Sequence, residues 1–368
     1  MADTPMIKLE EVTKVFPGAT RPAVEDLSLE VGEGEFVTLV GPSGCGKTTT
    51  LKMINRIIEP TSGRIEIGGK DALAVEPHIL RRSIGYVIQQ IGLFPHRTVA
   101  ENMATVPRLL DWDEARITQR VNELVDLVGL EEEMLARYPA ELSGGQQQRV
   151  GVARALAADP PVLLMDEPFG AVDPIVRGRL QEEFLDLHER LGKTVVFVTH
   201  DIDEALLLGT RVAILNIGGI LEQYDAPEAI LAEPVNAFVE DFLGGERGLK
   251  RLALRTVSEA DLSPGPVVSV DSTVDEARAT MSEHEVDWFG LLDADGMLLG
   301  WVPENALDGT PLAELETRPF ALSLSPHSSL RQAIDAVVTS HARVAVVVDE
   351  GRYLGMVDLE GIAEEITE

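Results

Sequence analysis

Short runs of mainly apolar residues recur along the first two thirds of the chain, and polar or glycine-rich residues follow each of them. Three such runs lie at residues 35–40, 162–165 and 195–198. Each run is too short for a helix and does not alternate with polar positions, which is typical of parallel strands buried on both faces. Residues 49–55 and 113–128 have a helical pattern. The hydrophobic pattern therefore predicts an α/β fold built on a parallel sheet.

The first of these runs leads directly into a phosphate-binding motif. Residues 41–48 read Gly-Pro-Ser-Gly-Cys-Gly-Lys-Thr, which fits the pattern Gly-x-x-x-x-Gly-Lys-Thr in full. Between a strand and a helix, such glycines let backbone amides face phosphate oxygens, and the start of the helix adds a positive dipole. We expect Lys47 to reach the β- and γ-phosphates and the Thr48 hydroxyl to ligate Mg²⁺. A glycine-rich turn without a ligand is the alternative.

The two later runs also end in residues that suit nucleotide chemistry. Asp166 and Glu167 follow the second run, and Thr199 and His200 follow the third. Ligand-binding residues of open parallel sheets gather at the carboxyl ends of the strands. We expect Asp166 to hold Mg²⁺ through water and Glu167 to polarise the attacking water as a general base. Taken alone, two adjacent acids would equally fit a solvated strand end.

A second glycine-rich turn, Leu142-Ser-Gly-Gly-Gln146, lies about a hundred residues after the first and opens another predicted helix. With this turn, the chain resembles the ATP-binding subunits of ABC transporters over about its first 245 residues. The resemblance implies a P-loop nucleotide-binding domain with a helical subdomain at about residues 90–158. It also implies that the second turn touches the γ-phosphate of ATP held by another copy, so that two copies meet head to tail.

Other positions match the motifs of that family residue by residue. Phe16 is similar to the aromatic residue that stacks on adenine. Asp173 matches the loop that crosses the dimer interface, although Val172 stands where leucine is more usual. His200 resembles the histidine that contacts the γ-phosphate and helps to hold the attacking water. Gln89 resembles the glutamine that links the γ-phosphate and metal to the transmembrane partner, with the adjacent Gln90 as an alternative.

The resemblance thus implies a full set of site residues for an ATPase that uses ATP and Mg²⁺. The catalytic residues would be Glu167, His200, Gln89 and Lys47, and the Mg²⁺ ligands would be Thr48, Gln89 and Asp166. The residues implied to contact ATP are Phe16, Gly41, Pro42, Ser43, Gly44, Cys45, Gly46, Lys47, Thr48, Thr49, Ser143, Gly144, Gly145, Gln146 and Asp173.

Charge and composition narrow the class of ABC ATPase. The net charge is −31 and the sequence pI is about 4.5. A surface this acidic repels nucleic acid and anionic lipid, so membrane attachment would need a protein partner. No apolar run approaches the roughly 18 residues of a membrane span, and the polar start is not a signal peptide. The lone Cys45 suits a reducing compartment. We expect a peripheral protein on the cytoplasmic face of the inner membrane.

A change of pattern near residue 245 predicts a second domain. We expect residues 1–245 to form the ATP-binding domain and residues 246–250 to form a linker, because Gly244, Gly245 and Gly248 make this joint flexible. Beyond the linker, a weak internal repeat resembles a tandem pair of CBS domains, at about residues 251–310 and 311–368. A generic α/β dimerisation module without a ligand is the alternative.

The usual nucleotide-binding residues of CBS domains are missing from both repeats. Copies that bind adenine nucleotides commonly carry Thr or Ser after a Gly-x-Val strand and Asp three positions later. The corresponding residues are Pro303 with Ala306, and Asp358 with Gly361. We therefore do not expect ribose recognition of the usual kind.

A CBS pair attached to an importer-type ATPase most resembles the energy subunits for quaternary-amine osmolytes, such as glycine betaine, choline, carnitine or proline betaine. The implied partners are a second copy of the chain, transmembrane permease subunits and, through the permease, an external solute-binding protein. No nucleic acid is implied. The alternatives are an importer for another small solute, a soluble ABC ATPase that acts on nucleic acid or ribosomes, and a nucleotide-gated switch with little turnover.

Overall fold

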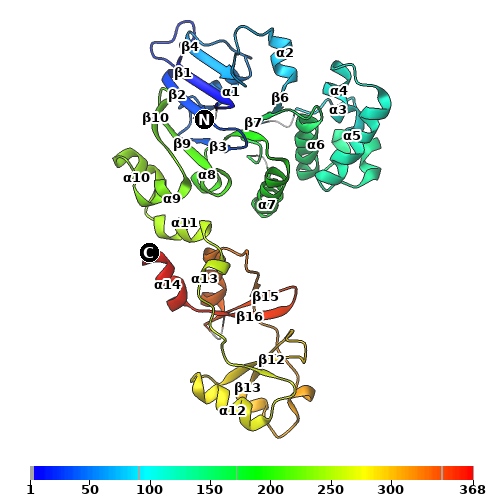
Figure 1. Cartoon of the computed structure of the whole chain (residues 1–368), viewed down its shortest axis with the longest axis vertical. Helices are drawn as coiled ribbons and strands as arrows, with labels where there is room; N and C mark the ends of the chain where they lie inside the picture. Colours follow the sequence, from blue (N-terminus) through cyan, green and yellow to red (C-terminus); the bar gives the residue numbers. More distant parts are fainter. Residues whose placement is uncertain (1–3, 90–91, 171, 341–342, 368) are drawn as a thin grey trace. The chain divides into compact units, whose positions relative to one another are not determined.

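The chain divides into two compact units (Figure 1). The computed structural model describes residues 4–89, 92–170, 172–340 and 343–367. The first unit ends at Gly244 and the second begins at Gly245. Each unit has hydrophobic clusters of its own.

Six strands form the main sheet of the first unit, in the order β10-β9-β3-β8-β7-β6 (Figure 1). Neighbouring strands from β9 to β6 pair in parallel, and β10 pairs antiparallel with β9. The strands are Phe36–Val40 (β3), Ile84–Val87 (β6), Val162–Asp166 (β7), Thr194–Val198 (β8), Arg211–Asn216 (β9) and Ile220–Asp225 (β10). The predicted parallel sheet is therefore confirmed.

The central strands of this sheet are buried on both faces. All five residues of β3, of β7 and of β8 are buried. Val195 and Phe197 of β8 lie in one hydrophobic cluster, and Val196 and Val198 lie in another. A strand that packs against apolar residues on both faces has few polar positions to interrupt it. This explains why continuous apolar runs located these strands in the sequence.

A second, antiparallel sheet and helix α1 (Lys47–Ile54) cover one face of the main sheet. Its strands, in the order β2-β1-β4-β5, are Val24–Val31 (β2), Ile7–Lys14 (β1), Ser62–Ile67 (β4) and Lys70–Asp71 (β5). One cluster joins Leu29 of β2 and Leu51 of α1 to Val196 of β8. This packing fixes the start of α1 at the carboxyl end of β3.

Helices α3 to α6 form a separate group beside the main sheet (Figure 1, cyan to green). They are Val99–Met103 (α3), Thr105–Leu109 (α4), Glu114–Leu127 (α5) and Gly144–Leu156 (α6), with 3₁₀ turns at Glu132–Ala136 and Pro139–Glu141. The helix predicted over residues 113–128 is confirmed as α5. Its N-cap is Asp113, whose side chain accepts a hydrogen bond from the backbone N–H of Arg116.

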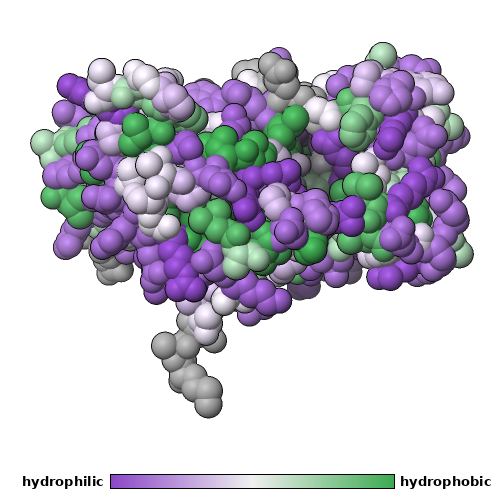
Figure 2. Space-filling model, turned by 90° about the horizontal axis from the view of Figure 1, so that it is seen from above, coloured by the Kyte–Doolittle hydropathy of each residue, from purple (hydrophilic) through white to green (hydrophobic). Residues whose placement is uncertain are grey.

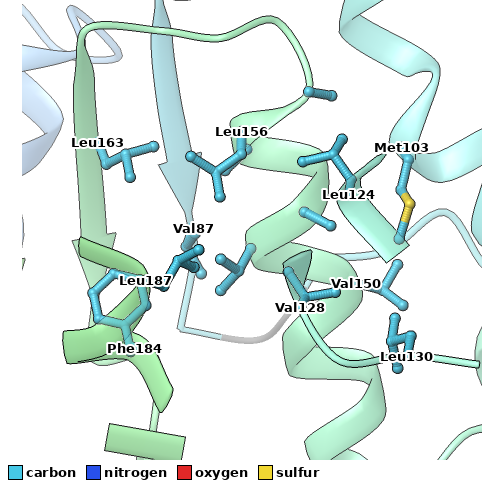
Figure 3. Packing of buried hydrophobic residues seen from close by; sticks show 14 of the residues in the cluster. Val87, Met103, Leu124, Val128, Leu130, Val150, Leu156, Leu163, Phe184 and Leu187 are labelled. Atoms are coloured by element: carbon cyan, nitrogen blue, oxygen red, sulfur yellow. The ribbon is translucent and has the colours of Figure 1, made fainter. Parts of the chain in front are cut away.

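A hydrophobic cluster joins this helical group to the main sheet. Figure 3 shows Leu156 of α6 between Leu163 of β7 and Leu124 of α5. Phe184 and Leu187 of α7 belong to the same cluster. The other helices of the first unit are Pro77–Arg82 (α2), Pro174–Leu191 (α7), Ile202–Leu208 (α8), Pro227–Ala232 (α9) and Ala237–Leu243 (α10).

The second unit contains the same small topology twice. Each copy is a three-stranded sheet in which the first two strands pair in parallel and the last two pair antiparallel. The first sheet consists of Val267–Ser269 (β11), Trp288–Leu292 (β12) and Leu298–Pro303 (β13), and the second of Ser323–Leu324 (β14), Ala345–Asp349 (β15) and Arg352–Val357 (β16). The helices are Val274–Glu283 (α12), Leu330–Thr339 (α13) and Leu359–Thr367 (α14). The weak sequence repeat thus has a structural counterpart.

The linker predicted over residues 246–250 is wrong, because most of it lies in a helix. Helix α11 spans Arg247–Leu254, and its Leu252 is buried in a cluster with Leu330 and Ala333 of α13. Gly248 weakens the intrinsic helix propensity of this segment. The burial of Leu252 outweighs that cost, so the segment belongs to the second unit.

The face seen in Figure 2 is mainly hydrophilic, with hydrophobic residues in scattered patches. Within the described ranges, no helix is both long and apolar enough to cross a membrane.

Candidate active site

Close backbone contacts shape the loop between β3 and α1. Gly46 directly precedes α1 and has a left-handed φ of 105°. A Cβ atom on Gly46 would lie 2.5 Å from the carbonyl oxygen of Ala23, and a Cβ atom on Gly41 would lie 2.1 Å from that of Leu215. Both distances are far below van der Waals contact, so any side chain at either position would displace the loop.

Most of the predicted phosphate-contacting residues surround one hollow of about 220 Å³, the nucleotide hollow. It is lined by Ser43, Gly44, Gly46, Lys47, Thr48 and Thr49, together with Ala23 and Glu167. The buried Lys47 donates from Nζ to the carbonyl oxygens of Gly41 at 2.7 Å and Pro42 at 3.2 Å. The ammonium group is thereby held beside the start of α1, where the helix dipole also favours an anion.

Cys45 lies in the same loop but faces the core. Its side chain is fully buried in the cluster between the two sheets. Its backbone N–H donates to the carbonyl oxygen of Pro42 at 3.2 Å. The Cys45 thiol therefore fills the core rather than the nucleotide hollow, which leaves the predicted contact with ATP to its backbone.

Thr48 and Asp166 form a pair of oxygen donors at the edge of the sheet. The Thr48 hydroxyl donates to Asp166 Oδ1 at 2.8 Å. Burial raises the pKa of the Asp166 carboxyl, although the hydrogen bond from Thr48 and the charge of Lys52 oppose that rise. Hydroxyl and carboxylate oxygens suit Mg²⁺, which usually takes few protein ligands and keeps water or phosphate oxygens for the rest. In the described part of the chain, no three His, Cys, Asp or Glu side chains cluster as a metal cage.

Two predicted catalytic residues, Gln89 and His200, contact the carboxylate of a third, Glu167. Gln89 donates from Nε2 to Glu167 Oε2 at 2.9 Å, and His200 Nδ1 lies 3.3 Å from the same oxygen. These residues follow β6, β7 and β8, which are neighbours in the sheet. The parallel strands thus deliver all three side chains to the edge of the nucleotide hollow. The alternative glutamine, Gln90, lies outside the described residues.

A buried polar contact that the sequence did not predict supports the segment after His200. The side chain of Asp201 caps α8 by accepting hydrogen bonds from the backbone N–H groups of Asp203 and Glu204. The largely buried Glu204 accepts a hydrogen bond from Gln181 Nε2 of α7 at 2.8 Å, and burial raises the pKa of its carboxyl. The contact ties α8 to α7. The sequence does not single out Glu204, because the neighbouring Asp203 is also an acid in the first turn of α8.

Asn102 shapes the segment that follows Gln89. Its side chain is fully buried, and Nδ2 donates to the carbonyl oxygens of Phe94, Arg97 and Thr98. Its Oδ1 accepts a hydrogen bond from the Phe94 N–H at 2.8 Å. The Phe94 ring is left 38% exposed. Asn102 was not predicted from the sequence, since a lone asparagine has no motif around it.

Phe16 lies in the loop after β1 and is 40% exposed. The Lys14 ammonium is 5.3 Å from the centre of its ring. An exposed ring has a face available for stacking, as the prediction for adenine requires.

The second glycine-rich turn begins α6 and does not line the nucleotide hollow. Ser143 Oγ accepts a hydrogen bond from the Gln146 N–H, and Gln146 Oε1 accepts one from the Ser143 N–H. A Cβ atom on Gly144 would meet nothing within 4 Å, and Gly144 does not have a positive φ. Nothing within the described chain therefore requires glycine at this position. Asp173 is exposed and directly precedes α7.

Comparison with known proteins places this geometry in a family. Residues 24–170 match the family model described as ABC transporter. The osmoprotectant import ATP-binding protein OsmV of Salmonella typhimurium is 48% identical over 98% of this chain and 96% of its own length. The chain belongs to the ABC transporter family. The glycine betaine/carnitine/choline transport ATP-binding protein OpuCA of Bacillus subtilis is 47% identical over 95% of this chain and 93% of its own length.

Solved ABC cassettes share the fold of part of this chain. The cassette MJ0796, in a dimeric post-hydrolysis state bound to ADP and phosphate, is 37% identical, with a TM-score of 0.54 over 60% of this chain and 99% of its own. The predicted ABC-type fold and ATPase activity are confirmed. Residues 312–368 match the CBS domain model, which agrees with the second predicted repeat. The CBS assignment of the first repeat stays a prediction.

Proposed function

We propose that this chain is the ATP-hydrolysing, energy-coupling subunit of an importer for quaternary-amine osmolytes, with glycine betaine, choline, carnitine and proline betaine as the solute class. The supporting observation is the share of the chain that its relatives match. OsmV and OpuCA of Bacillus subtilis match 95% or more of it, which includes the second unit. The spermidine/putrescine import ATP-binding protein PotA of Chromobacterium violaceum is 45% identical over 65% of it. The relatives that match both units are thus named for osmoprotectant or quaternary-amine import, which favours an osmolyte as the solute.

In this proposal, Glu167 is the general base that takes a proton from the attacking water. Gln89 and His200 both contact its carboxylate and hold it at the edge of the nucleotide hollow. Lys47 and the start of α1 stabilise the negative charge of the phosphates. Thr48, Asp166 and Gln89 would hold Mg²⁺, which would supply positive charge to offset the negative charge on the phosphates.

Two copies would enclose each ATP between them. The nucleotide hollow of one copy supplies the phosphate loop and Phe16, and the other copy supplies the turn formed by Ser143, Gly144, Gly145 and Gln146. The open space around Gly144 supports this arrangement, because a phosphate oxygen can approach the backbone there. Asp173 would lie at the boundary between the copies. Two solved cassettes of this family are described as dimeric.

We further propose that a permease docks at a hollow of about 290 Å³ beside Gln89, the docking hollow. Its lining includes Tyr86, Phe94, Val106 and Arg154. It also includes the buried Asn55, whose Oδ1 has no hydrogen-bond partner in the described part of the chain. An exposed aromatic ring and an unpaired acceptor are suited to an inserted helix that brings a donor. Docking would hold the chain on the cytoplasmic face of the membrane.

The test is ATP-driven uptake in proteoliposomes that hold this chain with the permease and solute-binding protein encoded beside it. Glycine betaine should stimulate both uptake and ATP hydrolysis, with spermidine as the matched control solute. Stimulation by spermidine and not by glycine betaine would refute the osmolyte assignment. Co-purification with ribosomes instead of a permease would favour the soluble alternative. A chain that binds ATP and never hydrolyses it would favour the nucleotide-gated switch.

Docking has its own control within the chain. Phe94→Asp should abolish co-purification with the permease and leave hydrolysis by the free chain unchanged, because a charge in the docking hollow opposes burial of the partner helix. Val235 is also an exposed apolar residue, and it lies in the loop after α9. Equal loss of assembly in Val235→Asp would argue against a specific site at Phe94.

A further inference from the structure

A hollow of about 330 Å³, apart from the nucleotide hollow, lies between α6 and α7. Its apolar wall includes Val152 of α6, Phe169, and Leu180 and Phe184 of α7. Val128, just after α5, also lines it, and Figure 3 shows Val128 beside α6, with Phe184 and Leu187 on α7. None of the residues predicted to contact ATP, Mg²⁺ or the permease is part of this lining. We call it the α6/α7 hollow.

One buried donor in this lining lacks an acceptor. Gln148 of α6 is 2% exposed, and its Nε2 has no hydrogen-bond partner among the described residues. Buried side-chain donors are almost always paired, because an unpaired one loses its hydration without compensation. The Nε2 atom is itself enclosed by protein atoms, so a rotation of the Gln148 side chain would bring this unpaired N–H to an oxygen of a molecule bound in the α6/α7 hollow.

The charges around the hollow are balanced. The lining contains three guanidinium groups and three carboxylates, which belong to Arg149, Arg179, Arg190, Asp126, Glu183 and Asp186. Arg149 and Arg179 both pair with Glu183. A ligand with a net charge would meet as much repulsion as attraction in such surroundings. A molecule that carries both charges can place each beside its opposite.

Two aromatic rings complete the lining. The centres of the Phe169 and Phe184 rings are 6.3 Å apart in an edge-to-face arrangement. Aromatic rings attract cations, and the attraction strengthens when water is excluded. The volume lies at the lower end of the range for small-molecule sites.

We propose that the α6/α7 hollow binds a small zwitterion, a carboxylate joined to an apolar, methylated cation. The carboxylate accepts the hydrogen bond of Gln148, and the cation lies against Phe169 and Phe184. Helix α6 begins at the Ser143 turn and α7 follows Asp173, so the bound molecule contacts both helices that lead to the proposed dimer interface. The choice of a transported betaine as the occupant rests on the proposed function.

The first test follows the Gln148 side-chain amide by ¹⁵N NMR while glycine betaine is added to the full chain without nucleotide. The Gln148→Leu spectrum identifies the signal. We expect it to move saturably, with a midpoint in the millimolar range. Tetramethylammonium has the cation without the carboxylate, and acetate has the reverse, so each alone should move it far less. Gln119, an exposed glutamine of α5 that pairs with Glu123, is the control signal.

The second test measures affinity by calorimetry. Gln148→Leu removes the donor and Gln148→Glu puts a repelling carboxylate in its place, so both should weaken binding by about tenfold or more. Gln119→Leu should bind as the unaltered chain does. Equal affinity in all variants, or linear shifts shared by Gln119, would overturn the proposal, since glycine betaine would then be acting only as an excluded osmolyte. Neither test involves hydrolysis or uptake, so failure here leaves the proposed function intact.

Discussion

The two units show how sheet topology decides where chemistry can occur. In the first, five adjacent parallel strands end at one edge, where Gln89, Glu167 and His200 meet. In the second, each sheet has a single parallel pair, and the positions that would recognise ribose are Ala306 and Gly361. Convergence of polar side chains needs several strand ends at the same place. The second unit therefore suits a regulatory role better than a catalytic one.

The largest expected effect is the loss of ATP hydrolysis when the proposed general base is replaced. Glu167→Gln keeps the size of the side chain and its contact with Gln89 but removes the basic carboxylate. Turnover should fall by about a hundredfold or more, because a positioned general base contributes that much. ATP should then accumulate unhydrolysed in a closed dimer, which nucleotide analysis of the purified dimer would detect.

Glu182→Gln is the matched control, since Glu182 is an exposed acid on α7. It should hydrolyse ATP at the rate of the unaltered chain. Normal hydrolysis by Glu167→Gln would remove Glu167 from the role of base.

The next largest effect tests whether the ATP site of one copy is completed by the Gly144 turn of a second copy. Gly144→Ala adds a methyl group where this chain offers open space, so the fold should be kept. The methyl group would keep the phosphate from the backbone, and hydrolysis should fall by about tenfold or more, as for loss of a phosphate-binding donor. This variant should also form the ATP-bound dimer less readily, which light scattering would measure.

Gly178 supplies the control, because it is also an exposed helical glycine with nothing within 4 Å of its Cβ position. Both substitutions should raise helix stability, by about 0.5 kcal/mol or slightly more. Only Gly144→Ala should lose activity. Equal activity in the two variants would contradict the shared site.

A smaller effect is expected from removing the second unit. A chain that stops after Gly244 keeps the hydrophobic clusters of the first unit, so its basal ATP hydrolysis should be unchanged. In the reconstituted transporter, the response of hydrolysis to ionic strength should change. Identical salt profiles for the full and shortened chains would show that the second unit does not regulate in this way.

The weakest signal is expected from nucleotide binding to the second unit. Residues 245–368 have hydrophobic clusters of their own, so this fragment can be studied alone. Calorimetry with AMP should give no heat above dilution, because Ala306 and Gly361 offer no carboxylate to the ribose hydroxyls. Micromolar affinity for AMP would contradict this and would make the second unit a nucleotide sensor.

The sequence indicated which polar residues lie together at the nucleotide hollow, but it did not indicate the contacts that support them. Asp166 and Glu167 were located because they end an apolar strand, and Lys47 because it lies in a phosphate motif. Asn102 and the contact between Gln181 and Glu204 were not predicted. These supports join elements that are far apart in the chain, and such pairings depend on tertiary packing rather than on local pattern.

The prediction of a flexible linker was wrong for a related reason. Glycines near residue 246 indicated flexibility, but the burial of Leu252 against α13 decides that α11 is helical. Cys45 shows that a motif does not determine where every side chain points. It lies in the phosphate-binding loop, but its side chain is buried in the core.

The capping box at Ser143 has an energetic consequence for the association of two copies. The Ser143 oxygen already accepts a hydrogen bond from the Gln146 N–H, so the hydroxyl proton points away from that bond and can serve an incoming anion. Gln146 in turn holds the Ser143 backbone. The donors are thus oriented before any nucleotide arrives, and association would need little reorganisation of this turn. A preorganised turn of this kind lets the free energy of ATP binding go into closing the dimer.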